Sequence, residues 1–123
     1  MELVPLLKSL NEKLNLTPSP DQCVLFGEVI LVTGGAGSIG SEIVVQSIAR
    51  GATKVIVLDN CENSLYKLEQ RLETEGEIYL QKAVLVLGDY GDKNLVTRIV
   101  RDYEPSILVH AGAYKHVPIL QYN

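Results

Sequence analysis

The stretch that decides the fold is VTGGAGSIGSEI, residues 32–43. An apolar, β-branched run, EVILVT at residues 28–33, leads into its glycines, and a segment with helical character at residues 38–51 follows them. A strand, a glycine-rich turn and a helix in this order form the start of a dinucleotide-binding unit. The spacing therefore predicts a pyrophosphate site, with a tight strand-to-helix turn that binds no ligand as the alternative.

Three glycines of this stretch are expected to meet three different steric demands. Gly34 allows the tight turn, Gly37 lets the backbone approach a pyrophosphate, and Gly40 permits close packing of the helix on the strand. The backbone N–H groups around Ser38 and Ile39 lie at the positive end of the predicted helix, where they would face the phosphates. No Gly-Lys-Ser/Thr follows the glycines, so the motif is not that of a P-loop nucleotide hydrolase.

Apolar runs alternate with helical segments from residue 28 onward. The predicted strands lie at residues 28–33, 54–59, 83–89 and 106–113, and the predicted helices lie at residues 38–51, 62–76 and 92–105. Strands that are apolar on both faces and separated by helices are typical of a parallel sheet covered on both sides. Right-handed connections then give an α/β fold, a Rossmann-like doubly wound sheet with four strands in this truncated chain.

Polar residues at the ends of the second and third predicted strands extend the site. Asp59 lies where an acidic residue binds ribose hydroxyls, and a carboxylate there repels a 2′-phosphate, which favours NAD over NADP. The alternative is that Asp59 caps the helix that starts near Glu62. Asp89 and Tyr90 follow the third strand and are expected at the adenine edge of the same crevice.

The first 22 residues differ from the rest of the chain. Leucines at helical spacing predict a short amphipathic helix within residues 2–15, and the prolines of residues 15–22 predict a linker. We therefore divide the chain into an N-terminal helix and linker, residues 1–22, and a partial NAD(P)-binding Rossmann domain, residues 23–123.

Composition excludes several partners. The net charge is −4 and the basic residues are scattered singly, which argues against nucleic-acid binding. No apolar run is long enough to span a membrane and no signal peptide precedes the domain, so we expect a cytoplasmic chain. The two cysteines, Cys23 and Cys61, lack the spacing of metal ligands and are expected to be reduced thiols, with no metal site.

The motifs together resemble a known family. The spacing TGxxGxxG resembles the extended short-chain dehydrogenase/reductase family, and HAGAYKHVPILQYN at residues 110–123 is similar to its CapD-like polysaccharide biosynthesis branch. That branch contains nucleotide-sugar 4,6-dehydratases, which are lyases, and epimerases. LDNCENSLYKLE at residues 58–69 resembles the same branch, so the similarity covers about residues 29–123.

The resemblance implies a set of cofactor-binding residues at the turn and the strand ends. These are Gly34, Gly37, Ser38, Ile39 and Gly40 for the pyrophosphate, Asp59 and Asn60 for the adenosine ribose, Asp89 and Tyr90 for the adenine, and Ala111 and Ala113 beside the cofactor. Lys115 would reach toward the nicotinamide and the nucleotide sugar, with a solvated loop lysine as the alternative. His110 is expected to be a strand-end histidine bonded to the backbone rather than a catalytic base.

The resemblance also implies what this chain does not contain. The family's Tyr-x-x-x-Lys pair, which moves the proton of the sugar C4 hydroxyl, would follow residue 123. We therefore expect the NAD-binding portion of a nucleotide-sugar 4,6-dehydratase or epimerase in polysaccharide biosynthesis, acting on a UDP-N-acetylglucosamine-type substrate, with no catalytic residue and no turnover of its own. The alternative is a non-catalytic nucleotide-binding or regulatory module. An exposed edge of the half sheet predicts a homo-oligomer or cover by the N-terminal helix.

Overall fold

The computed structural model describes residues 24–111. The helix and linker predicted in residues 1–22 lie outside the described residues, and so do the predicted site residues Ala113 and Lys115.

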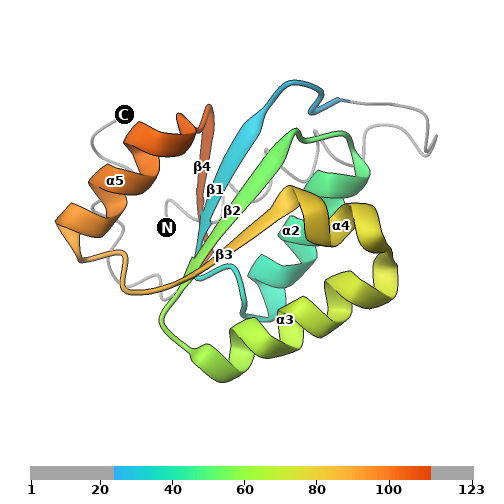
Figure 1. The fold of residues 1–123 in the computed structure, drawn as a ribbon, viewed down its shortest axis with the longest axis horizontal. Coiled ribbons are helices and arrows are strands. Elements are labelled where there is room, and N and C mark those ends of the chain that lie inside the picture. Colours follow the sequence, from blue (N-terminus) through green and yellow to red (C-terminus); the bar gives the residue numbers. More distant parts are fainter. Residues whose placement is uncertain (1–23, 112–123) are drawn as a thin grey trace.

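The centre of the fold is a parallel sheet of four strands in the order β3-β2-β1-β4 (Figure 1). The strands are β1 (Val29–Thr33), β2 (Lys54–Asp59), β3 (Ala83–Leu87) and β4 (Ile107–His110). Thr33 pairs with Leu58 on one side and with His110 on the other, so three strands end level with one another. This arrangement confirms the predicted Rossmann-like sheet, and it brings the polar strand-end residues to one edge.

Helices cover both faces of the sheet, as predicted. They are α2 (Ser38–Ala49), α3 (Glu62–Glu75), α4 (Glu77–Lys82) and α5 (Lys93–Tyr103). Figure 1 shows α2, α3 and α4 on one face and α5 on the other. No helix in the described part of the chain is long and apolar enough to cross a membrane.

The strands bury both of their faces because successive side chains point to opposite sides of the sheet. Ile30 and Val32 pack in the cluster that includes residues of α2 and α3, whereas Leu31, between them, packs in a second cluster with Ile99 of α5. Continuous apolar strands are therefore required here, and this is why their sequences show no polar alternation.

The structure adds one element that the sequence pattern did not predict. Residues 77–82 form the short helix α4, which begins directly after Gly76. Gly76 adopts a φ of 145°, so it ends α3 as predicted and also turns the chain into the next helix. Tyr79 and Leu80 of α4 pack against the core cluster on the α2 and α3 face. Six residues are too few to show helical periodicity, so packing rather than pattern reveals α4.

The remaining differences are shifts of element ends. The helix predicted over residues 38–51 ends at Ala49, with Gly51 just beyond it at a φ of 100°. At the end of α5, Glu104 takes a left-handed φ of 49°, a conformation in which many helices end, and the helix stops before Pro105 as predicted. The predicted strand 106–113 ends at His110, and the described chain leaves the sheet at Ala111.

Candidate functional site

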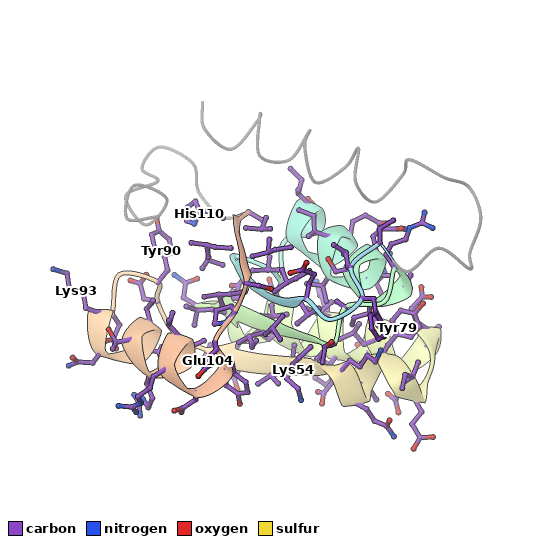
Figure 2. All side chains as sticks on the ribbon, turned by 90° about the horizontal axis from the view of Figure 1, so that it is seen from above. Lys54, Tyr79, Tyr90, Lys93, Glu104 and His110 are labelled. Atoms are coloured by element: carbon purple, nitrogen blue, oxygen red, sulfur yellow. The ribbon has the colours of Figure 1, made fainter. Side chains whose placement is uncertain are left out.

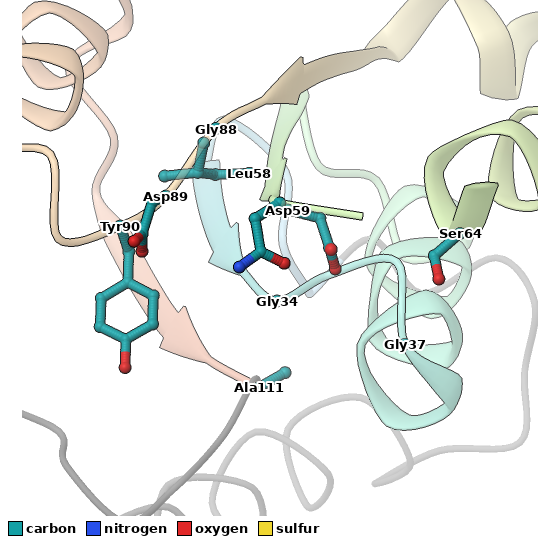
Figure 3. Close-up of a pocket in the computed structure, with 10 residues that line it drawn as sticks. Gly34, Gly37, Leu58, Asp59, Ser64, Gly88, Asp89, Tyr90 and Ala111 are labelled. Carbon is teal, nitrogen blue, oxygen red and sulfur yellow. The ribbon is translucent and has the colours of Figure 1, made fainter. Parts of the chain in front are cut away.

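A cleft of about 320 Å³ opens at the carboxyl end of the sheet. Figure 3 shows it between the glycine-rich turn and the ends of the strands. It is lined by Gly34, Gly37, Leu58, Asp59, Asn60, Ser64, Gly88, Asp89, Tyr90 and Ala111. The chain passes over one face of the sheet between β1 and β3 and over the other face before β4, so its direction switches between β1 and β4. Ligands of open α/β sheets bind at such switch points.

The glycine-rich turn packs as tightly as its sequence predicts. Gly34 has a φ of 69°, a left-handed conformation that favours glycine, and its N–H donates to the carbonyl oxygen of Leu58 at 2.7 Å. A Cβ at Gly40 would lie 2.5 Å from both the Gly34 carbonyl oxygen and the Gly35 Cα. Gly40 therefore lets α2 pack against the turn itself, rather than against the strand as predicted. Gly35 was not singled out from the sequence, yet a Cβ there would lie 2.6 Å from Val57 Cγ1.

Gly37 differs from the other glycines of the turn because the fold leaves room for a side chain there. Its φ of −72° suits any residue, and a Cβ would come no closer than 3.7 Å to another heavy atom, the Gly34 carbonyl oxygen. Gly37 is exposed and lines the cleft. The space that a side chain would fill is thus left open on the side of the cleft.

The N-terminus of α2 faces this space, and within residues 24–111 no side chain caps it. Gly37 is the N-cap residue and has no side chain that could accept from the first turn. Along the helix, the Ser41 N–H is the first to donate to Gly37, at 2.8 Å from the Gly37 carbonyl oxygen. The N–H groups of the first three helical residues have no acceptor within a helix, because the carbonyls four residues earlier lie outside it. Ser38, Ile39 and Gly40 carry these groups and start α2 beside the cleft without lining it.

Asp59 lies at the end of β2 and bonds to two backbone groups. Its Oδ2 accepts from the Ala36 N–H at 3.1 Å, and its Oδ1 accepts from the Cys61 N–H at 2.8 Å. Helix α3 has no side-chain cap, so the carboxylate bonds to the residue before the helix and not to its first turn. The predicted alternative, that Asp59 caps α3, is thus limited to the bond from the Cys61 N–H.

The segment after β3 forms another wall of the cleft. The Oδ1 of Asp89 accepts from the Gly91 N–H at 3.0 Å, which closes a tight turn. A Cβ at Gly88 would meet a terminal methyl of the Leu95 side chain of α5, so this side chain packs closely over Gly88. Asp89 and Tyr90 both line the cleft, with Tyr90 half-buried.

A buried polar pair, Thr33 and His110, lies next to Tyr90. The Oγ1 of Thr33 and the Nδ1 of His110 are 2.5 Å apart, and both residues are fully buried at the ends of neighbouring strands. The His110 ring meets Tyr90 edge to face, with centroids 4.5 Å apart, as Figure 2 shows. The position of His110 at the end of β4 is as predicted, while its Nδ1 meets the side-chain hydroxyl of Thr33 and its ring contacts Tyr90 in the wall of the cleft.

The sequence analysis did not predict three of the residues that line the cleft. Leu58 and Gly88 are neighbours of predicted residues at the same strand ends, and Ser64 lies on the first turn of α3. The Ser64 hydroxyl donates to the Sγ of Cys61 at 3.1 Å, and this bond lowers the pKa of the fully exposed Cys61 thiol. Within residues 24–111 no three His, Cys, Asp or Glu residues cluster as metal ligands.

Several proteins with similar sequences are named for polysaccharide biosynthesis or for the conversion of nucleotide sugars. The chain is 39% identical over 100 residues to the capsular polysaccharide biosynthesis protein CapD of Staphylococcus aureus, covering 80% of this chain and 16% of CapD. It is 35% identical over 92 residues to the dTDP-glucose 4,6-dehydratase of Xanthomonas campestris, covering 71% of this chain and 23% of that enzyme. It is 34% identical over 88 residues to a UDP-glucose 4-epimerase of Klebsiella pneumoniae, covering 72% of this chain and 60% of the epimerase. The chain thus spans about a sixth of the length of CapD.

Structural comparison agrees on the fold. The crystal structure of Pen from Bacillus thuringiensis matches with a TM-score of 0.63 and 21% identity, covering 80% of this chain and 29% of that one. Residues 30–123 match the family described as polysaccharide biosynthesis protein, more than half of the chain. With the glycine turn, the strand-end residues and these relatives in agreement, the chain belongs to the CapD-like polysaccharide biosynthesis family of extended short-chain dehydrogenases/reductases.

Proposed function

We propose that the cleft binds NAD and that the chain supplies the cofactor site of a nucleotide-sugar 4,6-dehydratase or epimerase. The observation that carries this proposal is the uncapped N-terminus of α2 at the switch point of the sheet, with the carboxylate of Asp59 beside it. Relatives named as a dehydratase and an epimerase of nucleotide sugars support the same reading.

The residues of the cleft fit a dinucleotide. Open space at Gly37 and the N–H groups of Ser38 and Ile39 suit a doubly anionic pyrophosphate, because a helix N-terminus offers donors and a positive dipole end. The carboxylate of Asp59 would accept hydrogen bonds from the hydroxyls of the adenosine ribose, and the side-chain amide of Asn60 could donate or accept there.

On the other side of the cleft, Asp89 and Tyr90 would flank the adenine, since a half-buried aromatic ring offers a flat apolar surface. Ala111 leaves space for the cofactor at the end of β4, and Ala113 would continue this wall. When bound, NAD supplies the hydride acceptor and donor for the sugar.

The charges of the cleft favour NAD over NADP. The Asp59 carboxylate would repel a 2′-phosphate, and no Lys or Arg is among the described residues that line the cleft. A 2′-phosphate would therefore meet a negative charge and no positive one.

We assign the substrate to the UDP-N-acetylhexosamine class, with Lys115 as its contact in this chain. No Tyr-x-x-x-Lys motif occurs at a matching place in the sequence, so we expect the chain alone to bind the cofactor without turnover.

Titration calorimetry with NAD and NADP tests the site directly. We expect NAD to bind at least ten-fold more tightly than NADP, and Asp59→Ser to reduce this ratio. Equal binding of both cofactors would refute the role of Asp59 in selectivity, and binding of neither would refute the site. Conversion of UDP-N-acetylglucosamine to a 4-keto product by this chain alone would show that the proton relay lies within it.

A further inference from the structure

The carboxylate of Asp59 joins two segments that are separate in the chain. Oδ2 accepts from the N–H of Ala36 in the glycine-rich turn, and Oδ1 accepts from the N–H of Cys61 before α3. Within residues 24–111, no other side chain is hydrogen-bonded to residues 34–37. Asp59 is thus the side chain that connects β2 to the middle of the turn.

The turn needs such a contact because glycines leave its backbone flexible. At its start, Gly34 is held by the carbonyl of Leu58 at 2.7 Å, but at its end the Gly37 N–H reaches the Gly34 carbonyl only at 3.4 Å. The bond from Ala36 to Asp59 lies between these two points, directly before the residue that lines the cleft.

We propose that Asp59 is a positioning residue for the pyrophosphate site: its bond to Ala36 holds the turn in the shape that presents the N-terminus of α2 to the ligand. The inference rests on the proposed function and adds to the ribose contact, since each carboxylate oxygen keeps acceptor capacity after one N–H bond. Asp59 would therefore support binding in two ways. It would contact the ribose directly, and it would act on the pyrophosphate only through the shape of the turn.

A ligand without ribose hydroxyls separates the two roles. Asp59→Ala removes both carboxylate oxygens, so neither the Ala36 N–H nor the Cys61 N–H keeps its side-chain acceptor. If Asp59 only binds ribose, this variant weakens ADP but binds 2′,3′-dideoxy-ADP as tightly as the wild type or more tightly, because a negative charge near the phosphates has been removed. If Asp59 positions the turn, both ligands lose affinity.

We expect Asp59→Ala to weaken the binding of 2′,3′-dideoxy-ADP at least five-fold in calorimetry. The matched control is Asp92→Ala, which removes a carboxylate that also accepts from a backbone N–H, that of Leu95, but does not line the cleft. The control should bind the dideoxy ligand as tightly as the wild type or more tightly. Unchanged or tighter binding of the dideoxy ligand by folded Asp59→Ala overturns the inference and leaves the proposed function intact. A wild-type chain that binds neither nucleotide overturns both.

Amide hydrogen exchange of the unliganded wild type gives a second measurement if the variant does not fold. The N–H of Ala36 should exchange at least ten-fold more slowly than that of Ser38, after correction for intrinsic rates, because only the first has an acceptor among the described residues. Equal protection of the two would show that the Asp59 bond does not hold the turn, and would overturn the inference.

Discussion

Two helices of this fold begin at the same edge of the sheet, but only one of them has a side chain that caps its N-terminus. Helix α5 follows β3, and its N-cap residue Asp92 accepts from the Leu95 N–H at 3.2 Å through Oδ1. Helix α2 follows β1, and its N-cap residue Gly37 offers no side chain. Gly37 lines the cleft, whereas Asp92 does not.

The difference shows which helix end the chain satisfies by itself. A glycine N-cap is only a few tenths of a kcal/mol less favourable than aspartate, so the fold tolerates the bare end of α2 at little cost. What the bare end provides is a set of N–H donors with room for an anion in front of them. Four substitutions test this contrast, from the largest expected effect to the smallest.

Gly40→Ala should have the largest effect, on stability. The new Cβ would lie 2.5 Å from backbone atoms of Gly34 and Gly35, which are not free to move as a flexible side chain would be. We expect a loss of about 3 kcal/mol in the free energy of unfolding, measured by urea denaturation. Gly37→Ser is the matched control with a clear space for its Cβ, and a similar loss in both variants would contradict the packing argument.

Gly37→Asp should have the next largest effect, on binding. It gives α2 the kind of cap that α5 has, and places a carboxylate where the pyrophosphate is proposed to lie. We expect at least a hundred-fold loss of NAD affinity by calorimetry, with the free energy of unfolding unchanged or raised by a few tenths of a kcal/mol. Retained affinity would show that the N-terminus of α2 is not the anion site.

Asp92→Ala applies the opposite change to the capped helix. Removing the acceptor of the Leu95 N–H should lower the free energy of unfolding by about 1 kcal/mol in urea denaturation. NAD affinity should stay within two-fold of the wild type, because Asp92 does not line the cleft. A large loss of affinity would mean that the two helix ends are not independent.

Glu42→Gln should have the smallest effect, and a pH-dependent one. Glu42 is the first acidic residue in the sequence of α2, and it pairs with Arg71 of α3 at 2.7 Å. The hydrogen bonds from Arg71 and then Gln46 hold the pKa of Glu42 below its usual value of 4.5. A carboxyl with a lowered pKa stabilises the fold above its unfolded value, and this contribution is lost as the pH falls through the folded value.

Because both side chains of the pair are substantially exposed, 39% for Arg71 and 52% for Glu42, we expect less than about 0.5 kcal/mol at pH 7. Urea denaturation of wild type and Glu42→Gln at pH 7 and pH 3 measures the difference. It should be smaller at the lower pH, and a difference that does not shrink there would point to packing rather than charge.

The sequence by itself determined the sheet, the glycine turn and the place of Asp59. Apolar runs and helical periodicity are local properties, and the steric demands on Gly34 and Gly40 concern atoms only a few residues apart. The sequence also predicted that the ends of β1, β2 and β4 lie close together, because parallel strands separated by helices must end at one edge of the sheet.

Tertiary structure decided what these strand ends contact. The short helix α4, the Ser64 contribution to the cleft and the Thr33–His110 pair depend on packing between segments that no local pattern connects. The bond between Ala36 and Asp59 is of the same kind, since a side chain that the sequence marks as a ribose ligand also meets a backbone N–H across the sheet edge. Residue types and spacing identify a candidate ligand, but only the folded chain determines which donors lie within reach of its oxygens.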